Sequence, residues 1–249
     1  MHLTVAGRRL EYDDIPGSDP PLVLLHEGLG SVGLWRSFPA DLARATGRRV
    51  VAFSRFGHGD SDPPPRPRTP DFMHEEAREV LPQVLEQLGI ERPVLVGHSD
   101  GASIALIHAA EHPTERVVAM APHVFVEPMC VEEIRSVREG YENGLRDRMS
   151  RHHRDPDAAF FGWNDVWLHA DFPRWNIEDV LPRIEVPLLL IQGEHDQYGT
   201  MEQLDRIERA AAGPVRRVHL HAGHAPHVEA PRETLDAVAE FVAPAQRSS

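Results

Sequence analysis

A serine set between glycines carries the strongest chemical signal in this sequence. Ser99 lies in the motif GHSDG at 97–101, between the apolar run 93–98 and the small-residue stretch 100–111. A sharp turn from a strand into a helix needs small residues on both sides, and it lifts a serine hydroxyl above the edge of a sheet. The pattern therefore predicts that Ser99 is a nucleophile, and the alternative is an ordinary strand-to-helix turn.

A serine needs a base to take its proton and a carboxylate to orient that base. Asp196 follows the apolar run 186–193, and His224 follows the run 215–221. In open α/β sheets, ligands and catalytic groups gather at the carboxyl ends of the strands. We therefore expect Asp196 and His224 to meet Ser99 there as the acid and the base.

Other residues compete for these roles. Glu194 offers an alternative acid, and His227 offers an alternative base. His221, His224 and His227 also recur at every third position, as ligands of a metal could. Pro226 interrupts regular helix between them, however, and no acid at metal-ligand spacing completes the set. We therefore predict no metal site.

Apolar segments rich in β-branched residues alternate with helical patterns along the chain. The predicted strands are 22–26, 49–54, 93–98, 116–122, 186–193 and 215–221, preceded by a hairpin over 3–12. The predicted helices are 72–88, 100–111 and 232–242, and Pro82 should kink the first of them. Strands without strict polar alternation suit a parallel sheet that is buried on both faces. The predicted fold class is therefore α/β, a doubly wound and mostly parallel sheet.

One segment, 125–181, interrupts this alternation. It is too long for a simple crossover, and it carries apolar residues at helical spacing and three of the four tryptophans. We predict that residues 1–124 and 182–249 form the α/β core and that 125–181 is an inserted helical cap.

Five short motifs occur in an order that resembles the α/β-hydrolase superfamily: HEGLGS, SRFGHGDSD, GHSDG, GEHD and GHAPHVEAP. The resemblance covers nearly the whole chain, with the predicted cap as the variable part. It implies a serine hydrolase with the triad Ser99, Asp196 and His224, which needs no metal or organic cofactor. It also implies an oxyanion hole formed by the backbone N–H groups of Gly28 and Asp100, the latter turning its backbone and not its side chain to the hole.

The loop after the first parallel strand permits a second interpretation. Gly28, Gly30 and Gly33 have the G-x-G-x-x-G spacing of a dinucleotide-binding loop. Pro39 interrupts the helix that such a loop requires, and this interpretation leaves the serine, acid and histidine unexplained. Glu27 stands where the superfamily more often has glycine. Its carboxylate would oppose an oxyanion if it pointed inward, so we expect it to point away.

Aromatic residues are expected to shape the substrate pocket. Trp163, Trp167 and Trp175 of the predicted cap, together with Trp35, would wall an apolar acyl pocket, and His123 could face it. Packing within the cap is the alternative for each tryptophan. The predicted reaction is cleavage of a carboxylic ester of a small or medium acid. A lactone, thioester or C–C hydrolase, a cofactor-free perhydrolase or acyltransferase, and a non-catalytic ligand-binding protein of this fold are the alternatives.

The composition and net charge limit the kinds of molecule that this protein could bind. The 249 residues are 41% hydrophobic and 26% charged, which is typical of a globular chain, and the single cysteine, Cys130, excludes an intrachain disulfide. The net charge of −13 argues against a nucleic-acid or anionic-membrane surface. No apolar run has the length of a membrane span, and no signal peptide is visible. We expect a cytoplasmic protein that acts on a small-molecule acyl substrate. A homodimer is compatible with such folds, but no residue here indicates one.

Overall fold

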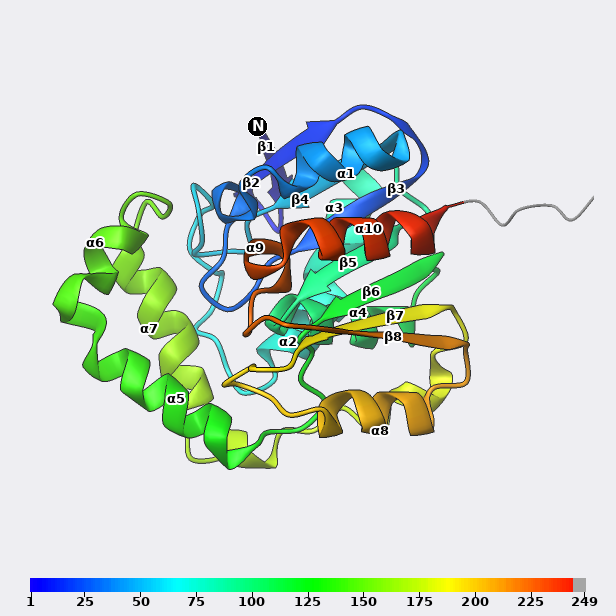
Figure 1. Cartoon of the computed structure of the whole chain (residues 1–249). Coiled ribbons are helices and arrows are strands. Elements are labelled where there is room, and N and C mark those ends of the chain that lie inside the picture. The colour runs from blue at the N-terminus through cyan, green and yellow to red at the C-terminus, as the bar shows by residue number, and fades with distance from the viewer. Residues whose placement is uncertain (244–249) are drawn as a thin grey trace, which may run out of the picture.

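An eight-stranded sheet organises the chain (Figure 1), with the strand order β1-β2-β4-β3-β5-β6-β7-β8. The computed structural model describes residues 1–243, so positions 244–249 of the predicted core lie outside the described residues. The strands are β1 (His2–Val5), β2 (Arg8–Ile15), β3 (Ser18–Leu25), β4 (Arg48–Phe53), β5 (Val94–His98), β6 (Arg116–Met120), β7 (Leu188–Gly193) and β8 (Val215–Leu220). The pairs β1–β2 and β2–β4 are antiparallel, and all other neighbours are parallel. The predicted α/β class with a mostly parallel sheet is therefore confirmed.

Helices bury both faces of this sheet. Along β3, Leu22 and Leu24 belong to one buried cluster, whereas Val23 and Leu25 belong to the other. This alternation follows from the period of two residues along a strand. The first cluster packs against α1 (Phe38–Thr46) and α10 (Pro231–Val242), and the second packs against α3 (Leu81–Gln87), α4 (Asp100–Ala109) and α8 (Glu202–Ala210). Because both faces of the sheet are buried, consecutive residues along these strands are apolar and do not alternate with polar ones.

The helix predicted over 72–88 is divided into segments. The structure has α2 (Phe72–Glu75), a π-helical turn η2 (Glu76–Val80) and then α3, with Pro82 near the start of α3. A proline ring lacks the N–H that would bond one turn back, and a wider turn before it accommodates this loss. The disturbance expected at Pro82 therefore takes the form of a π turn. The remaining short elements of the core are η1 (Val32–Trp35) and α9 (Pro226–Glu229).

Between β6 and β7 the chain leaves the sheet and forms further helices. These are α5 (Pro128–Glu139), η3 (Tyr141–Leu145), α6 (Arg146–Met149), α7 (Pro156–Trp167), η4 (Phe172–Arg174) and η5 (Leu181–Arg183). Figure 1 shows α5, α6 and α7 together at one side of the sheet. The two ends of the excursion meet, because Phe125 pairs with Asn176 in an isolated bridge and the N–H of Ile177 donates to Val124 O at 2.8 Å. The exact bounds of a cap at 125–181 stay a prediction.

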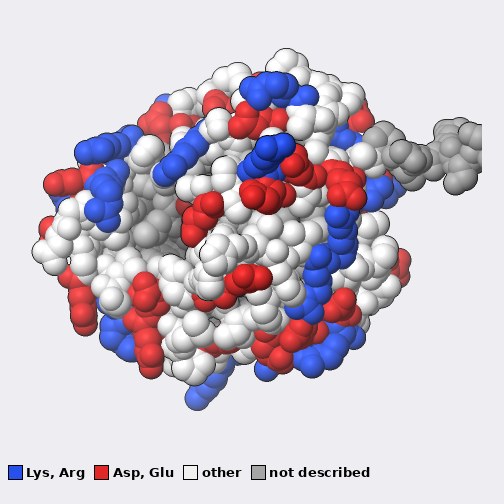
Figure 2. Space-filling view, viewed as in Figure 1, with Lys and Arg blue, Asp and Glu red and all other residues white. Residues whose placement is uncertain are grey.

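The surface carries charges of both signs. Figure 2 shows arginine side chains interspersed with acidic ones on the face that it presents. Within residues 1–243, no helix combines the length and the apolar character that crossing a membrane requires.

Candidate active site

Ser99 occupies a strained turn between β5 and α4. Its φ of +52° and ψ of −119° lie where non-glycine residues are rare. The N–H of Ser99 donates to Met120 O at 2.9 Å, which holds the turn against β6. A Cβ on Gly97 would overlap the backbone of Gly101, and a Cβ on Gly101 would overlap Leu25 O. The glycines of the GHSDG motif are therefore required because α4 packs closely on the sheet.

Three strand ends bring the predicted nucleophile, base and acid together. His224 Nε2 lies 2.9 Å from Ser99 Oγ, and His224 Nδ1 lies 2.9 and 2.8 Å from the two carboxylate oxygens of Asp196. The neutral imidazole with its proton on Nδ1 fits both contacts, since it donates to the carboxylate and accepts from the hydroxyl. This is the arrangement in which a serine can lose its proton as it attacks.

Asp196 is held as a carboxylate. Its Oδ1 accepts the N–H of Tyr198 at 2.8 Å, and its Oδ2 accepts Gln192 Nε2 at 2.8 Å. Burial opposes ionisation of this side chain, but the hydrogen bonds from His224 and Tyr198 hold its pKa below the ordinary value. The negative charge that would stabilise a protonated His224 is therefore already present at neutral pH.

The competing candidates lie elsewhere. The carboxylate of Glu194 is exposed and lies 3.6 Å from His221 Nδ1. His227 is buried, and its ring packs against Trp35 and Phe38 with centroids 4.8 and 5.6 Å apart. Among the described residues, the histidines at every third position do not form a group of ligands within reach of one another.

Glu27 lines the cavity beside Ser99, and the expectation that its carboxylate points away from the oxyanion stays a prediction. The Oε2 atom of Glu27 lies 3.5 Å from Nδ1 of the buried His98. Burial opposes ionisation of both groups, yet their attraction lowers the pKa of Glu27 and raises the pKa of His98. His98 also donates from Nε2 to His224 O at 2.7 Å. The Glu27 carboxylate therefore has a buried imidazole as its neighbour.

The loop that carries Glu27 and Gly28 is fixed by side chains of the core. His26 donates from Nδ1 to Glu27 O at 2.7 Å and accepts the N–H of Arg55 on Nε2 at 3.0 Å. The guanidinium of Arg55 also donates to Glu27 O at 2.9 Å. The single turn η1 follows this loop, and the longer helix α1 begins only at Phe38, with Pro39 in its first turn. In the described structure no long helix therefore opens on Gly33, as a dinucleotide site would require.

A histidine from beyond α6 also holds this loop. His153 donates from Nε2 to Leu29 O at 3.0 Å, and its Nδ1 accepts the N–H of Gly59 at 3.0 Å. Only the neutral ring with its proton on Nε2 satisfies both bonds. Burial lowers the pKa of His153, which favours this neutral ring. Sequence analysis did not identify His153, because its partners lie far away along the chain.

Two backbone N–H groups next to Ser99 point to no acceptor in the protein. Within residues 1–243, neither the N–H of Gly28 nor that of Asp100 donates a hydrogen bond to a backbone or side-chain group. Both residues line the cavity beside Ser99. An oxyanion held there could accept both bonds, as the resemblance to the superfamily implies.

The side chain of Asp100 is buried close to the cavity, which this residue lines. Among the described residues, its two carboxyl oxygens are buried without a hydrogen-bond partner, and Arg55 Nη2 lies 3.9 Å from Oδ2. Burial raises the pKa of Asp100, and the charge of Arg55 opposes this shift. A buried carboxyl group therefore belongs to the residue next to Ser99, close to the Arg55 guanidinium and the Trp167 indole.

A cavity of about 110 Å³ lies beside Ser99 and is mostly apolar. Of the predicted pocket residues, Trp163, Trp167 and His123 line it. Trp163 lies directly over the loop, because a Cβ on Gly28 would be 2.5 Å from Trp163 Cδ1. Burial lowers the pKa of His123 to about 3, so this ring is neutral at physiological pH.

Two predicted pocket residues, Trp35 and Trp175, lie outside this cavity, which corrects the prediction. Trp35 is 2% exposed and stacks on Phe38 at 5.9 Å on the opposite face of the sheet. Trp175 is 6% exposed and stacks on Phe172 at 5.8 Å. Both tryptophans pack in the core. A tryptophan can serve either in core packing or in a pocket wall, so residue type alone could not distinguish these roles.

Four further residues line the cavity without having been predicted: Leu29, Cys130, Ile134 and Tyr198. Cys130 and Ile134 are one turn apart on α5, so they share one face of that helix. This spacing was readable from the sequence, but the direction of that face was not. Tyr198 could have been found from its place two residues after Asp196.

Comparison with known proteins identifies similar proteins that are hydrolases by name. The model of the family described as "Alpha/beta hydrolase family" matches residues 22–237. The human protein "Serine hydrolase BPHL" is 28% identical over 237 residues, covering 88% of this chain and 77% of the human one. The mouse protein "sn-1-specific diacylglycerol lipase ABHD11" is 25% identical over 272 residues, covering 94% of this chain and 85% of the mouse one.

Among solved structures, the enol-lactonase from Burkholderia xenovorans LB400 is similar to this chain with a TM-score of 0.78. The match covers 97% of this chain and 99% of the enol-lactonase at 22% sequence identity. At this identity the likeness shows a shared fold.

Proposed function

Because the chain belongs to the alpha/beta hydrolase family, we propose that it is a serine hydrolase that cleaves a carboxylic ester through an acyl-enzyme on Ser99. One observation carries this proposal. Hydrogen bonds run from Ser99 Oγ through His224 to the Asp196 carboxylate, and the serine borders a cavity. The curated relatives, a serine hydrolase and a lipase by name, support the same class of chemistry.

In the proposed reaction, Ser99 Oγ attacks the acyl carbonyl while His224 Nε2 takes the hydroxyl proton. Asp196 stabilises the imidazolium that forms. The N–H groups of Gly28 and Asp100 would bind the oxyanion, and each such donor lowers the barrier by about 3 kcal/mol. His224 then protonates the leaving alcohol as the ester bond breaks. Water attacks the acyl-enzyme by the same route and releases the acid.

The lining of the cavity favours an acyl group without negative charge. Of the described residues, no arginine lines it, and His123 is neutral. Its carboxyl groups belong to Glu27, which is ionised, and Asp100. A carboxylate on the substrate would therefore lose its hydration without gaining a cationic partner, which is costly. We propose neutral esters of small or medium acids as the substrate class.

Hydrolysis of p-nitrophenyl esters by the purified full chain tests the proposed activity. We expect turnover with an initial burst of p-nitrophenol, because the acyl-enzyme forms before water resolves it. Ser99→Ala should abolish both. Ser31→Ala is the matched control, since Ser31 is also buried and its hydroxyl has no hydrogen-bond partner among the described residues. Equal loss in both variants, or turnover that survives Ser99→Ala, would contradict the proposal.

The charge preference is tested with two substrates of similar length. The neutral p-nitrophenyl butyrate should be cleaved faster than the anionic mono-p-nitrophenyl succinate, by about tenfold or more in kcat/KM. Equal rates on both esters would show that the cavity accepts an anion, and would overturn the substrate class while leaving Ser99 as the nucleophile.

A further inference from the structure

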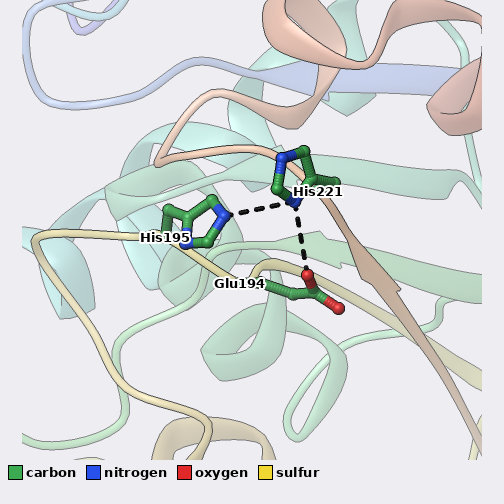
Figure 3. Close-up of side chains that lie close together, drawn as sticks. All are labelled: Glu194, His195 and His221. Atoms are coloured by element: carbon green, nitrogen blue, oxygen red, sulfur yellow. Dashed lines mark hydrogen bonds and ion pairs between the residues drawn. The ribbon is translucent and has the colours of Figure 1, made fainter.

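Two exposed imidazoles and a carboxylate converge outside the cavity, at the ends of β7 and β8. Figure 3 shows Glu194, His195 and His221 directed toward one another. His195 Nε2 lies 3.1 Å from His221 Nδ1, and His221 Nδ1 lies 3.6 Å from Glu194 Oε2. One potential ligand atom from each residue lies within 4.8 Å of the other two. Among the described residues, this is the one group of three such side chains at that spacing.

The backbone holds these side chains near one another. The N–H of Glu194 donates to Leu220 O at 2.8 Å, and the N–H of His195 donates to Ala222 O at 3.0 Å. These bonds continue the pairing of β7 with β8 beyond the strands. The separation of the backbone at Glu194 and His195 from the backbone at His221 is therefore set by the pairing of β7 with β8.

The geometry suits a transition-metal ion. A tetrahedral Zn²⁺ with bonds of about 2.0–2.1 Å holds its ligand atoms about 3.3–3.4 Å apart. The observed separations of 3.1 and 3.6 Å bracket that spacing, so rotations of the exposed side chains would close the site. The imidazole rings meet edge to face at 83°, with their centroids 4.6 Å apart. Imidazole and carboxylate ligands together bind Zn²⁺, Ni²⁺ and Cu²⁺.

We propose that Glu194, His195 and His221 form a binding site for one divalent transition-metal ion of the Zn²⁺ class. Water would complete the coordination, because the side chain of His221 is 84% exposed. None of the three residues lines the cavity, so the ion would not take part in the ester chemistry. Its position gives it a structural effect instead. It cross-links the chain two residues before Asp196 and three residues before His224.

Titration of the full chain with Zn²⁺ by calorimetry tests this site. We expect one ion per chain, and a rise in Tm at saturating Zn²⁺ because the ion binds only the folded arrangement. His195→Ala and His221→Ala should each weaken binding by about tenfold or more, and Glu194→Gln should weaken it less. All three should keep ester hydrolysis without metal, since none contacts the cavity.

His169→Ala is the matched control. His169 is exposed, and its Nδ1 lies 3.7 Å from Asp171 Oδ2, but within residues 1–243 no third metal-ligating side chain joins this pair. This variant should bind Zn²⁺ as the unaltered protein does. Unchanged Zn²⁺ affinity in His221→Ala, or no binding by the unaltered protein, would overturn the proposal.

A spectroscopic readout on the unaltered protein avoids the effect of substitutions on folding. With Cu²⁺ as the probe, the electron paramagnetic resonance spectrum should show coupling to two imidazole nitrogens. His195→Ala should reduce the coupling to one. A spectrum without nitrogen coupling, or one that is identical in the variant, would place the ion elsewhere and refute this assignment.

Discussion

The contact between Gly28 and Trp163 leads to a sharp prediction. A Cβ at position 28 would lie 2.5 Å from Trp163 Cδ1 and 2.8 Å from Trp163 Cε2, and closer still to Trp163 Nε1. Ordinary carbon contacts are about 3.5–4.0 Å, so Gly28→Ala creates an overlap of about 1 Å. Either the indole or the loop must move by about this distance. We expect the loop to share the displacement, because Trp163 is 7% exposed and its ring packs against Phe160.

The displacement acts on the N–H group that is proposed to bind the oxyanion. A misplacement of about 1 Å in a catalytic group can cost about 10²-fold in rate. Loss of one oxyanion donor costs about 10²–10³-fold in kcat. We therefore expect Gly28→Ala to lower kcat by about 10²-fold, with a smaller change in KM, because the donor acts mainly on the transition state.

Steady-state hydrolysis of p-nitrophenyl acetate across a double-mutant cycle measures this effect. Trp163→Ala alone should change acyl-length preference more than activity on this short ester. Combining it with Gly28→Ala should recover most of the lost kcat, because the overlap is gone. Gly33→Ala is the matched control, since a Cβ there would meet nothing closer than 3.5 Å.

Two results would refute this reasoning. Wild-type kcat in Gly28→Ala would show that the Gly28 N–H does not act in the reaction. A double variant as slow as Gly28→Ala would show that the loss does not come from the contact with Trp163. Thermal unfolding of each variant separates either result from a loss of folding.

Further predictions concern the acid, the loop and acid stability. Asp196→Asn should lower kcat by about 10⁴-fold in ester hydrolysis, because the imidazole is left in the wrong tautomer. A decrease in kcat of less than tenfold would show that another residue orients His224. His153→Ala should lower kcat by roughly tenfold through a loosened loop, whereas the exposed neighbour His152→Ala should not. Burial lowers the pKa of His123 and of His227 to about 3, so the unfolded chain takes up protons first on acidification. The stability that these neutral rings give is present above about pH 6.5 and is lost toward pH 3, by up to about 1.4 kcal/mol per pH unit for each ring. Urea unfolding at about pH 7 and about pH 5 measures this loss, and His227→Gln should reduce the slope.

Much of the fold was predictable because strand runs and small-residue turns are local features. All six parallel strands occur where apolar runs predict them, and the GHSDG turn forms between β5 and α4. The meeting of Ser99, Asp196 and His224 followed from a rule about strand ends, so distance along the chain was no obstacle.

Side-chain direction was harder to predict because it depends on packing between distant elements. Trp35 packs in the core between the sheet and α1, and Glu27 contacts His98. The residues next to them in the sequence indicate neither contact. The contact of His153 with Leu29 joins residues more than a hundred positions apart. The convergence of His195 and His221 likewise needed the β7–β8 register.

The central claim is that Ser99 is an activated nucleophile, and covalent labelling tests it most directly. The intact mass of the full chain is measured after exposure to a fluorophosphonate, beside Ser99→Ala and Ser31→Ala. The hydrogen bonds among Ser99, His224 and Asp196 predict one adduct on the unaltered protein and on Ser31→Ala, and none on Ser99→Ala. No adduct on the unaltered protein, or an adduct that persists in Ser99→Ala, would contradict this claim.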